Sequence, residues 1–304
     1  MERELSYLKR KRVSHTAMRN ALARASESKK PENERLFLDP FADKLLNFRY
    51  RCVLSLLILP VIGDGIFALR EKKFPGMIGD FLCRTRYIDD LVRSALDEGF
   101  EQMVFLGSGL DSRPYRIAGM NRICVYELDH PETQKWKVNR LERILGKIPP
   151  RVVFAPTDFN RMELERILAE ANFNGKHKTF IVLEGLTQYL KAESVDSIFR
   201  YLSKTVTSGF RVVFSYVHRG IIEGKPEFEN TGNLMFHLKR LGEPWIFGMV
   251  PDEVASYLDK FGLELVEHLD ASKIKKRYLK PLGRQMNVFA GEYVALAEKR
   301  SNGF

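Results

Sequence analysis

The sequence predicts an α/β fold in which a helical N-terminal region precedes a mainly parallel sheet with helices on both faces. Two observations carry this prediction. Beyond Gly99, short apolar runs alternate with helical stretches, which is typical of a buried parallel sheet. Before Gly99, apolar residues recur at helical spacing. No linker-like stretch divides the 304 residues, so we expect one domain over residues 1–304 with a helical N-terminal cap.

The cap is expected over residues 1–100. Residues 13–30 predict a helix with Thr16 as its cap. A second helix starts near Pro40, because proline suits the first helical turn. Residues 84–100 predict an amphipathic helix that ends close to Gly99.

The segment 52–69 is apolar enough to suggest a membrane span. Pro60 interrupts it, however, and Asp64 would be costly in lipid. We therefore expect a buried helix, a break and a second short apolar helix in this segment, and no membrane span.

The core is expected over residues 101–304, with an inserted substrate segment at 218–250. We expect its last two strands to pair antiparallel, because the loop between them has no helical pattern. The seven strand-like runs are residues 103–106, 123–126, 152–155, 180–183, 212–217, 263–268 and 289–297. The helical stretches are residues 135–145, 162–171, 194–206 and 251–261.

The composition is that of a globular protein, with 44% hydrophobic and 29% charged residues. Three distant cysteines and six scattered histidines form no metal-ligand pattern, so we expect core cysteines, a reducing cytoplasm and no metal site. The N-terminus lacks the apolar core of a signal peptide. The net charge of +10 is mostly spread along the chain, with clusters at 9–12 and 273–277, and predicts a solvated basic face more than a nucleic-acid surface.

A glycine turn follows the first apolar run of the core. Gly107-Ser108-Gly109 breaks the run, and the acid Asp129 closes the next one twenty residues later, which is typical of a nucleotide-type cofactor site. A dinucleotide site would have glycine where Ser112 stands, and Asp111 would repel a pyrophosphate. A cofactor without phosphate, such as S-adenosylmethionine, suits the turn better.

Acids follow three successive strand-like runs. Glu127 and Asp129 end the second run, Asp158 follows the third, and Glu184 follows the fourth. The carboxyl ends of parallel strands meet at one edge, where open α/β sheets bind ligands. Carboxylates at this edge favour a cofactor with a sulfonium cation.

These residues resemble the leucine carboxyl methyltransferase superfamily of S-adenosylmethionine-dependent methyltransferases, and most of all its prokaryotic branch of O-methyltransferase-like proteins. The resemblance implies a Rossmann-like class I methyltransferase fold, with a seven-stranded, mainly parallel sheet and an antiparallel final strand. The matching segments are residues 14–17 with 23–25, 38–42, 84–90, 106–113 with 115–116, 127–131 with Lys135, 157–159, and 184–185 with 189–190.

The resemblance also implies residue roles. Arg84 pairs with the cofactor carboxylate, Gly107 lies against its amino acid tail within the turn that includes Ser108 and Gly109, and Glu184 lies near the methionine part. Asp129 binds the ribose, with Glu127 as the rival for that role. Asp158 and Phe159 contact the adenine. We expect Asp111, Arg113 and Arg116 to brace the loop through salt bridges.

The expected activity is methylation of a carboxylate or hydroxyl on a small molecule or protein by in-line displacement. A hydroxyl acceptor would profit from a general base, for which His130, Tyr189 and His218 are candidates. The rival interpretations are an RNA-modifying methyltransferase, suggested by the net charge, and a cofactor-binding protein without catalysis. Ser112 disfavours a dehydrogenase.

Overall fold

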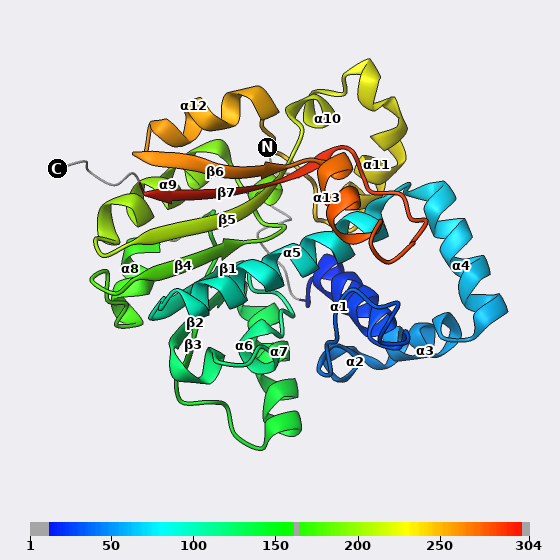
Figure 1. The fold of residues 1–304 in the computed structure, drawn as a ribbon, viewed down its shortest axis with the longest axis horizontal. Coiled ribbons are helices and arrows are strands. Elements are labelled where there is room, and N and C mark those ends of the chain that lie inside the picture. The colour runs from blue at the N-terminus through cyan, green and yellow to red at the C-terminus, as the bar shows by residue number, and fades with distance from the viewer. Residues whose placement is uncertain (1–11, 161–163, 300–304) are drawn as a thin grey trace.

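A seven-stranded sheet forms the centre of the molecule (Figure 1). The computed structural model describes residues 12–160 and 164–299. The strand order is β3-β2-β1-β4-β5-β7-β6, in which neighbouring strands are parallel except that β7 is antiparallel to both β5 and β6. The strands are β1 (Gln102–Leu106), β2 (Cys124–Asp129), β3 (Val152–Pro156), β4 (Thr179–Leu183), β5 (Phe210–Val217), β6 (Leu263–Leu269) and β7 (Glu292–Lys299).

The two faces of the sheet carry separate hydrophobic cores, because successive strand residues point to opposite sides. Val104 and Leu106 of β1 pack into one core, against α8 (Leu164–Glu170), α9 (Ala192–Thr205) and α12 (Val254–Asp259). Met103 and Phe105 pack into the other, against α5 (Met77–Asp97) and α13 (Ala271–Tyr278). Every residue of β1 is buried, so the continuous apolar run is explained by coverage on both faces.

The sheet's carboxyl edge is bordered by shorter elements. They carry the loops that follow the strands and the segment 218–250, which lies between β5 and β6. These elements are α6 (Arg113–Arg116), α7 (Pro131–Leu145), α10 (Arg219–Glu223), α11 (Gly232–Arg240) and the 3-10 helices at Thr187–Tyr189, Pro226–Thr231 and Pro251–Glu253, whereas the 3-10 helix at Met120–Arg122 leads into the amino end of β2.

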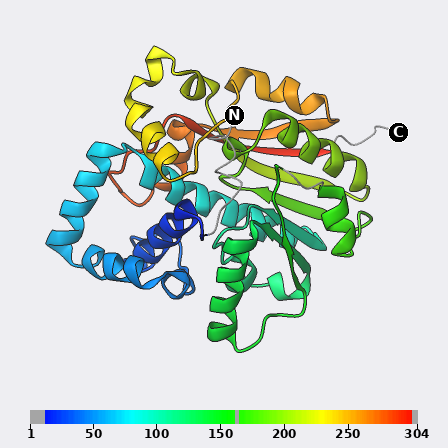
Figure 2. The same cartoon turned by 180° about the vertical axis from the view of Figure 1, so that it is seen from behind.

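Four helices precede α5 and lie beside the sheet (Figures 1 and 2). They are α1 (His15–Glu27), α2 (Ala42–Leu45), α3 (Phe48–Leu57) and α4 (Pro60–Lys73). The expectation that Thr16 caps the first helix is wrong, because the Ser14 side chain accepts the hydrogen bond from the Ala17 backbone N–H. Thr16 instead donates to the Glu243 carboxylate, which also accepts the N–H groups of His15 and Thr16 at distances of 3.0 and 3.1 Å.

The apolar segment 52–69 breaks at Pro60, as expected, but its helices are not buried. α3 buries only Leu54 and α4 buries only Gly63, whereas Val61 is 86% exposed and Leu69 is 70% exposed. No single helix of the described residues is long and apolar enough to cross a bilayer. α3 and α4 reach that length and apolar composition only as a pair, bent by 109°.

Two further expectations are corrected. The loop between the last two strands contains α13, which Asp270 caps by accepting from the Lys273 N–H at 2.8 Å. The cysteines are all free, but Cys52 is exposed rather than part of the core. The basic cluster at 9–12 lies almost wholly outside the described residues.

Candidate cofactor site and acceptor cavity

The glycine turn lies where the strand order reverses. β1 pairs with β2 on one side and β4 on the other, so the loops after β1 and β4 diverge at this point of the carboxyl edge. The N–H groups of Gly107 and Ser108 both donate to the Leu128 carbonyl, at 2.9 and 3.0 Å, which holds the turn over the end of β2. Gly107 has a φ of 70°, and a Cβ there would lie 3.0 Å from the Leu186 side chain. Both facts explain why the position requires glycine.

A first cavity opens over this turn. Asp129 holds the turn from β2, since its Oδ2 accepts the Gly109 N–H at 2.6 Å. The hydroxyl of Ser108 is buried in the cavity wall and makes no hydrogen bond in the described structure. The cavity is lined by all the predicted site residues except Arg84 and Glu127, namely Gly107, Ser108, Gly109, Asp129, Asp158, Phe159 and Glu184.

Glu127 lies beneath the cavity and does not line it. Its carboxylate is fully buried, where it accepts from the Tyr115 hydroxyl at 2.6 Å and pairs with the buried Lys137. Burial raises the pKa of Glu127 although Lys137 opposes the shift. The alternative that Glu127 binds the ribose therefore does not fit its position, and Asp129 is the acid that faces the cavity.

Arg84 lies behind the wall of the first cavity rather than in it, and its pairing with the cofactor carboxylate stays a prediction. Its guanidinium is buried among three carboxylates, at 2.6 Å from Glu292, 2.9 Å from Asp80 and 3.2 Å from Glu184. It lines a second cavity rather than the first. Its contact with Glu184 makes it a residue that positions a wall of the first cavity.

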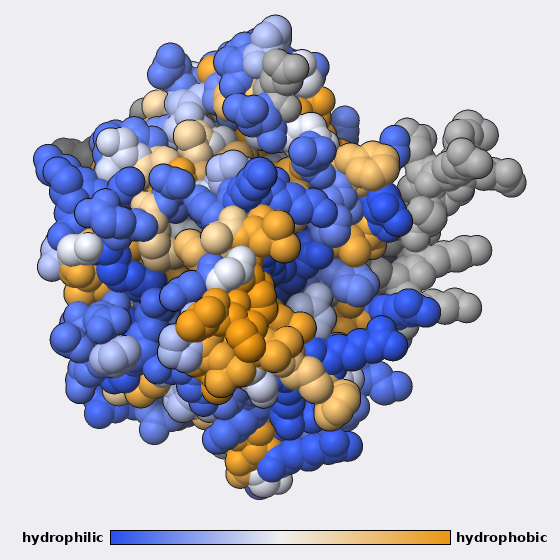
Figure 3. Space-filling view, turned by 90° about the vertical axis from the view of Figure 1, so that its right-hand side faces the viewer, coloured by the Kyte–Doolittle hydropathy of each residue, from blue (hydrophilic) through white to orange (hydrophobic). Residues whose placement is uncertain are grey.

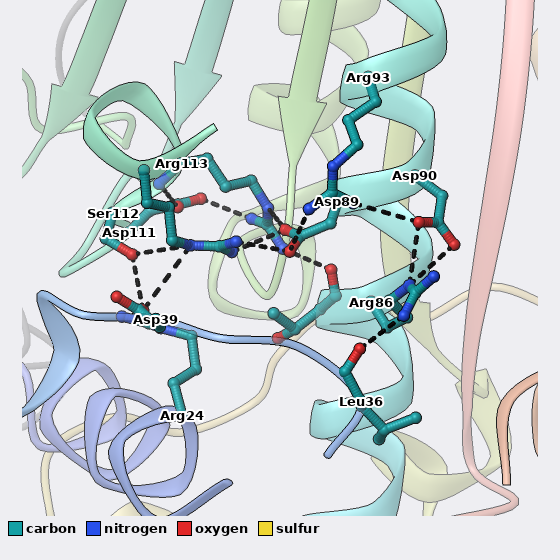
Figure 4. Close-up of polar contacts among 12 residues, drawn as sticks. Arg24, Leu36, Asp39, Arg86, Asp89, Asp90, Arg93, Asp111, Ser112 and Arg113 are labelled. Carbon is teal, nitrogen blue, oxygen red and sulfur yellow. Dashed lines mark hydrogen bonds and ion pairs between the residues drawn. The ribbon is translucent and has the colours of Figure 1, made fainter. Parts of the chain in front are cut away.

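The loop signature is braced by ion pairs, as expected from the sequence (Figure 4). Arg113 bridges three acids, with Asp111 at 2.5 Å and with Asp89 and Glu184 at 2.7 Å. Arg116 pairs with the same Asp89 at 2.6 Å. The network ties α5 and the loop after β4 to the glycine turn.

Electrostatics at the turn follow from these pairs. Burial opposes the charge of Asp111, but Arg113, Lys137 and Arg24 together lower its pKa to about 2. Burial opposes the charge of Asp89 in the same way, and Arg116 and Arg113 nevertheless lower its pKa. Asp111 and Asp89 are therefore ionised at neutral pH.

The second cavity lies beside the first and has a volume of about 480 Å³. The inner faces of α4 and α5 and the segment 218–250 give it a largely apolar wall, with Phe67, Met77, Leu234 and Trp245 among its members. Its size is that of a pocket for a small organic molecule. The residues shared by the two cavities are Thr16, Asn20, Phe81, Gly185 and Tyr189.

Two of the carboxyl groups in the wall of the second cavity lie next to each other. Asp80 comes from α5, and Glu292 is the first residue of β7, where it pairs with Val217 at the end of β5. Burial and the neighbouring Glu292 raise the pKa of Asp80 well above its usual range, against the opposing effect of Arg84. The protonated form of Asp80 is therefore favoured, and in that form its hydroxyl can donate a hydrogen bond to a neighbouring oxygen.

Two arginines line another part of the second cavity. Arg19 and Arg70 form no ion pair within the described residues, and Arg19 Nη2 donates to His237 Nε2 at 2.6 Å. Burial and the charge of Arg19 lower the pKa of Arg70, and burial and Arg19 also lower the pKa of His237. Two guanidiniums that repel each other in a half-buried cavity would be stabilised by an anionic group of a ligand.

The three candidate bases differ in position. Tyr189 lies at the junction of the cavities, and burial and Glu243 raise the pKa of its hydroxyl to about 12. His130 lines the first cavity and caps α7. His218 caps α10, packs on Phe228 and lines neither cavity.

Sequence reasoning missed the polar groups of the second cavity. The position of Glu292 could have been predicted, because the first residue of an antiparallel strand lies at the edge of the sheet where the neighbouring parallel strands end. For Arg19 and Asn20, the only sequence signal was their helical spacing to Thr16 and Ala23, which does not mark a binding site. Gln188, whose buried Oε1 makes no hydrogen bond in the described structure, had no signal.

Comparison with known proteins decides the family. The model of the leucine carboxyl methyltransferase family matches residues 17–203. This chain belongs to the leucine carboxyl methyltransferase family. The Bacillus subtilis (strain 168) protein "Putative S-adenosyl-L-methionine-dependent methyltransferase YktD" is 30% identical over 218 residues, which are 70% of this chain and 69% of the relative. A Mycolicibacterium gilvum (strain PYR-GCK) relative with the same description is 32% identical over 217 residues, covering 69% of this chain and 68% of its own.

Solved structures agree on the fold. A protein from Thermobifida fusca YX, described as a "putative methyltransferase", has a TM-score of 0.58 over 92% of this chain and 94% of its own, at 16% identity. A DUF574 family protein from Streptomyces avermitilis MA-4680 has a TM-score of 0.56 over 91% and 97%, at 13% identity. The expected Rossmann-like class I methyltransferase fold is thereby confirmed.

Proposed function

We propose that the protein is an O-methyltransferase that takes its methyl group from S-adenosyl-L-methionine and transfers it to an acceptor in the second cavity. Methyl transfer from this cofactor follows from the family, and transfer to oxygen is the proposed part. The observation that carries the proposal is the junction of the two cavities at Thr16, Asn20, Phe81, Gly185 and Tyr189.

The first cavity suits this cofactor. The turn brings backbone close to a ligand, and the buried Ser108 hydroxyl lacks a partner there. Asp129, Asp158 and Glu184 surround the cavity with negative charge, which favours a sulfonium cation and accepts hydrogen bonds from an adenosine. We assign the ribose to Asp129, the adenine to Asp158 and Phe159, and the methionine part to Glu184.

The bound cofactor supplies an electrophilic methyl group, so the protein's main task is to align an acceptor oxygen with it. Tyr189 and Phe81 stand at the junction and restrict how an acceptor enters. Arg19 and Arg70 would hold an acceptor carboxylate, which needs no general base. The Asp80–Glu292 pair would accept the hydrogen of a hydroxyl and take up its proton.

The acceptor group is tested with Arg70→Met and Glu292→Gln against a panel of apolar carboxylic acids and apolar alcohols or phenols, with radiolabelled cofactor. A carboxylate acceptor predicts that Arg70→Met raises KM at least tenfold and leaves the pH profile of kcat unchanged. A hydroxyl acceptor predicts that Glu292→Gln lowers kcat and removes a limb of its pH profile. Methylation of nitrogen or sulfur acceptors alone would contradict O-methylation.

The same assay addresses the rival functions. An RNA substrate predicts methyl incorporation into RNA and RNA binding that weakens steeply with salt. Cofactor binding without transfer to any acceptor would favour a non-catalytic role. We also retain the cytoplasm as the proposed compartment, because the exposed Cys52 is free and a reducing environment keeps such thiols unpaired.

A further inference from the structure

The outer face of the α3–α4 hairpin is an apolar surface without a partner. Leu54 of α3 and Gly63 of α4 are the only fully buried residues of the two helices, whereas Val61, Phe48 and Leu69 are 86%, 79% and 70% exposed. Figure 3 shows a continuous apolar area on this side of the molecule. We call it the hairpin face, and it consists of the exposed Phe48, Val53, Leu56, Ile58, Leu59, Val61, Ile62 and Leu69.

Cations flank the hairpin face at both ends. Beside α3, Lys44, Arg51, Arg140 and Arg143 line one surface hollow, and none of them forms an ion pair within the described part of the chain. Burial and then the charges of Arg51 and Arg143 lower the pKa of Arg140, so these like charges oppose one another.

The other end of the hairpin face carries the cations of α4. Its last turn contains Arg70, Lys72 and Lys73, of which Lys72 and Lys73 are exposed. The hairpin face is thus flanked by cations at both ends, and the exposed acid of α4, Asp64, belongs to the lining of the second cavity instead.

We propose that the hairpin face docks on the surface of an anionic lipid bilayer. Apolar side chains that enter the boundary of headgroups and acyl chains, with Lys and Arg around them at the headgroup level, are the composition of helices that lie in a membrane surface. Neither α3 nor α4 is long and apolar enough to cross a bilayer alone, and the 109° bend between them is compatible with both helices lying in such a surface.

Charge distinguishes this partner from a second copy of the chain. A twofold contact through the hairpin face would set the same cations against each other. An anionic bilayer instead satisfies them, and Lys72 and Lys73 can reach headgroups while their stems cover apolar surface. The inference stands independently of the proposed O-methylation. It also places the acceptor cavity, which Leu57 and Phe67 of the same hairpin line from inside, next to the membrane.

The test is co-sedimentation of the purified full chain with vesicles of phosphatidylcholine alone and of phosphatidylcholine mixed with phosphatidylglycerol. We expect binding to the mixed vesicles that weakens as salt is raised, and much weaker binding to phosphatidylcholine alone. Val61→Asp with Leu69→Asp should lower the partition coefficient by about tenfold or more. Arg51→Gln with Arg143→Gln should lower it by roughly fivefold for each charge removed, on mixed vesicles only.

Val266→Asp is the matched control. Val266 lies on β6 outside the hairpin face and is 50% exposed, so its substitution should leave vesicle binding unchanged. Thermal melting and cofactor binding verify that each variant folds. Absence of binding to mixed vesicles, or binding that Val61→Asp with Leu69→Asp leaves intact, overturns the proposal. A dimer that the same variants dissociate, with no vesicle binding, overturns it in favour of self-association.

Discussion

Glu127 and Asp129 lie two residues apart on one face of β2, yet their surroundings give them different tasks. Glu127 is enclosed with Lys137 and Tyr115, whereas Asp129 faces the first cavity and holds the Gly109 N–H. The spacing predicted correctly that both acids lie near the carboxyl edge of the sheet. It could not separate them, because the separation depends on a lysine from α7 and a tyrosine from α6 that pack beneath the strand.

Asp129→Asn should weaken binding of S-adenosylmethionine and S-adenosylhomocysteine by about a hundredfold, because it removes charge-assisted hydrogen bonds. Glu127→Gln should instead lower the free energy of unfolding and keep cofactor affinity within about threefold, since it leaves a buried lysine unpaired. Calorimetric titration and urea unfolding measure the two effects. If Glu127→Gln weakened cofactor binding and Asp129→Asn did not, the ribose-binding role would be assigned to Glu127.

Asp111 should make the free energy of unfolding depend on pH in the acid range. Its pKa falls from an ordinary 3.8 to about 2, so its contribution to stability is present above pH 3.8 and is lost as pH falls through about 2. That shift corresponds to about 2 kcal/mol, so Asp111→Asn should lose about this much at neutral pH and flatten the acid dependence.

Urea unfolding between neutral and acidic pH checks this expectation. The control is Asp90→Asn, because Asp90 pairs with Arg86 where both side chains are more than a third exposed. Exposed pairs contribute little, so its effect should be much smaller. Equal losses in the two variants would contradict a special role for the buried brace.

The glycine turn is the element that joins fold to site. Gly107→Ala should cost about 1–3 kcal/mol, because a side chain there adopts a strained positive φ and contacts Leu186. Gly146→Ala is the matched control, since Gly146 has a φ of 76° but open space around its Cβ position. The difference between their unfolding free energies isolates the crowding against Leu186, and no difference would contradict it.

Elements whose burial follows from local pattern were predicted well. All seven strands lie close to their apolar runs, and the signal was clearest for β1, β2, β4 and β5, because a strand buried on both faces is apolar throughout. α13 was missed, because it is rich in lysine and buries only Ile274, so its stability comes from the Asp270 cap and packing on α5. The prediction that the apolar segment of α3 and α4 is buried was wrong. An apolar helix indicates that its surface is stable only in contact with other apolar groups, but the sequence does not show whether the same chain supplies them.

In the candidate site, too, local sequence pattern predicted some residues and missed others. The acids after the strands were predictable because parallel strands end at one edge. The role of Arg84 at the cofactor stays a prediction from the resemblance. Its neighbours Asp80 and Glu292 come from α5 and β7, and only the tertiary structure shows that three carboxylates surround it. The second cavity depends on the arrangement of α1, α4, α5 and the segment 218–250, which no local pattern encodes.

At the scale of the whole molecule, cofactor binding should stabilise the fold. A ligand at a hundred times its Kd adds about 2.7 kcal/mol, which corresponds to a rise in Tm of roughly 4 °C for a chain of this size. S-adenosylmethionine and S-adenosylhomocysteine should both produce this rise in a thermal melt. NAD at the same concentration should not, and a comparable rise with NAD would reopen the dinucleotide interpretation.

The position of β7 between β5 and β6 has a consequence for how the chain reaches this structure. In the sheet β6 pairs with β7 alone, so it cannot join before β7 is in place, although it precedes β7 in the chain. The first five strands can assemble without either of them. A folding intermediate with a five-stranded parallel sheet and an open edge at β5 is therefore expected, and because Glu292 arrives with β7, the acceptor cavity is not complete until β7 has joined.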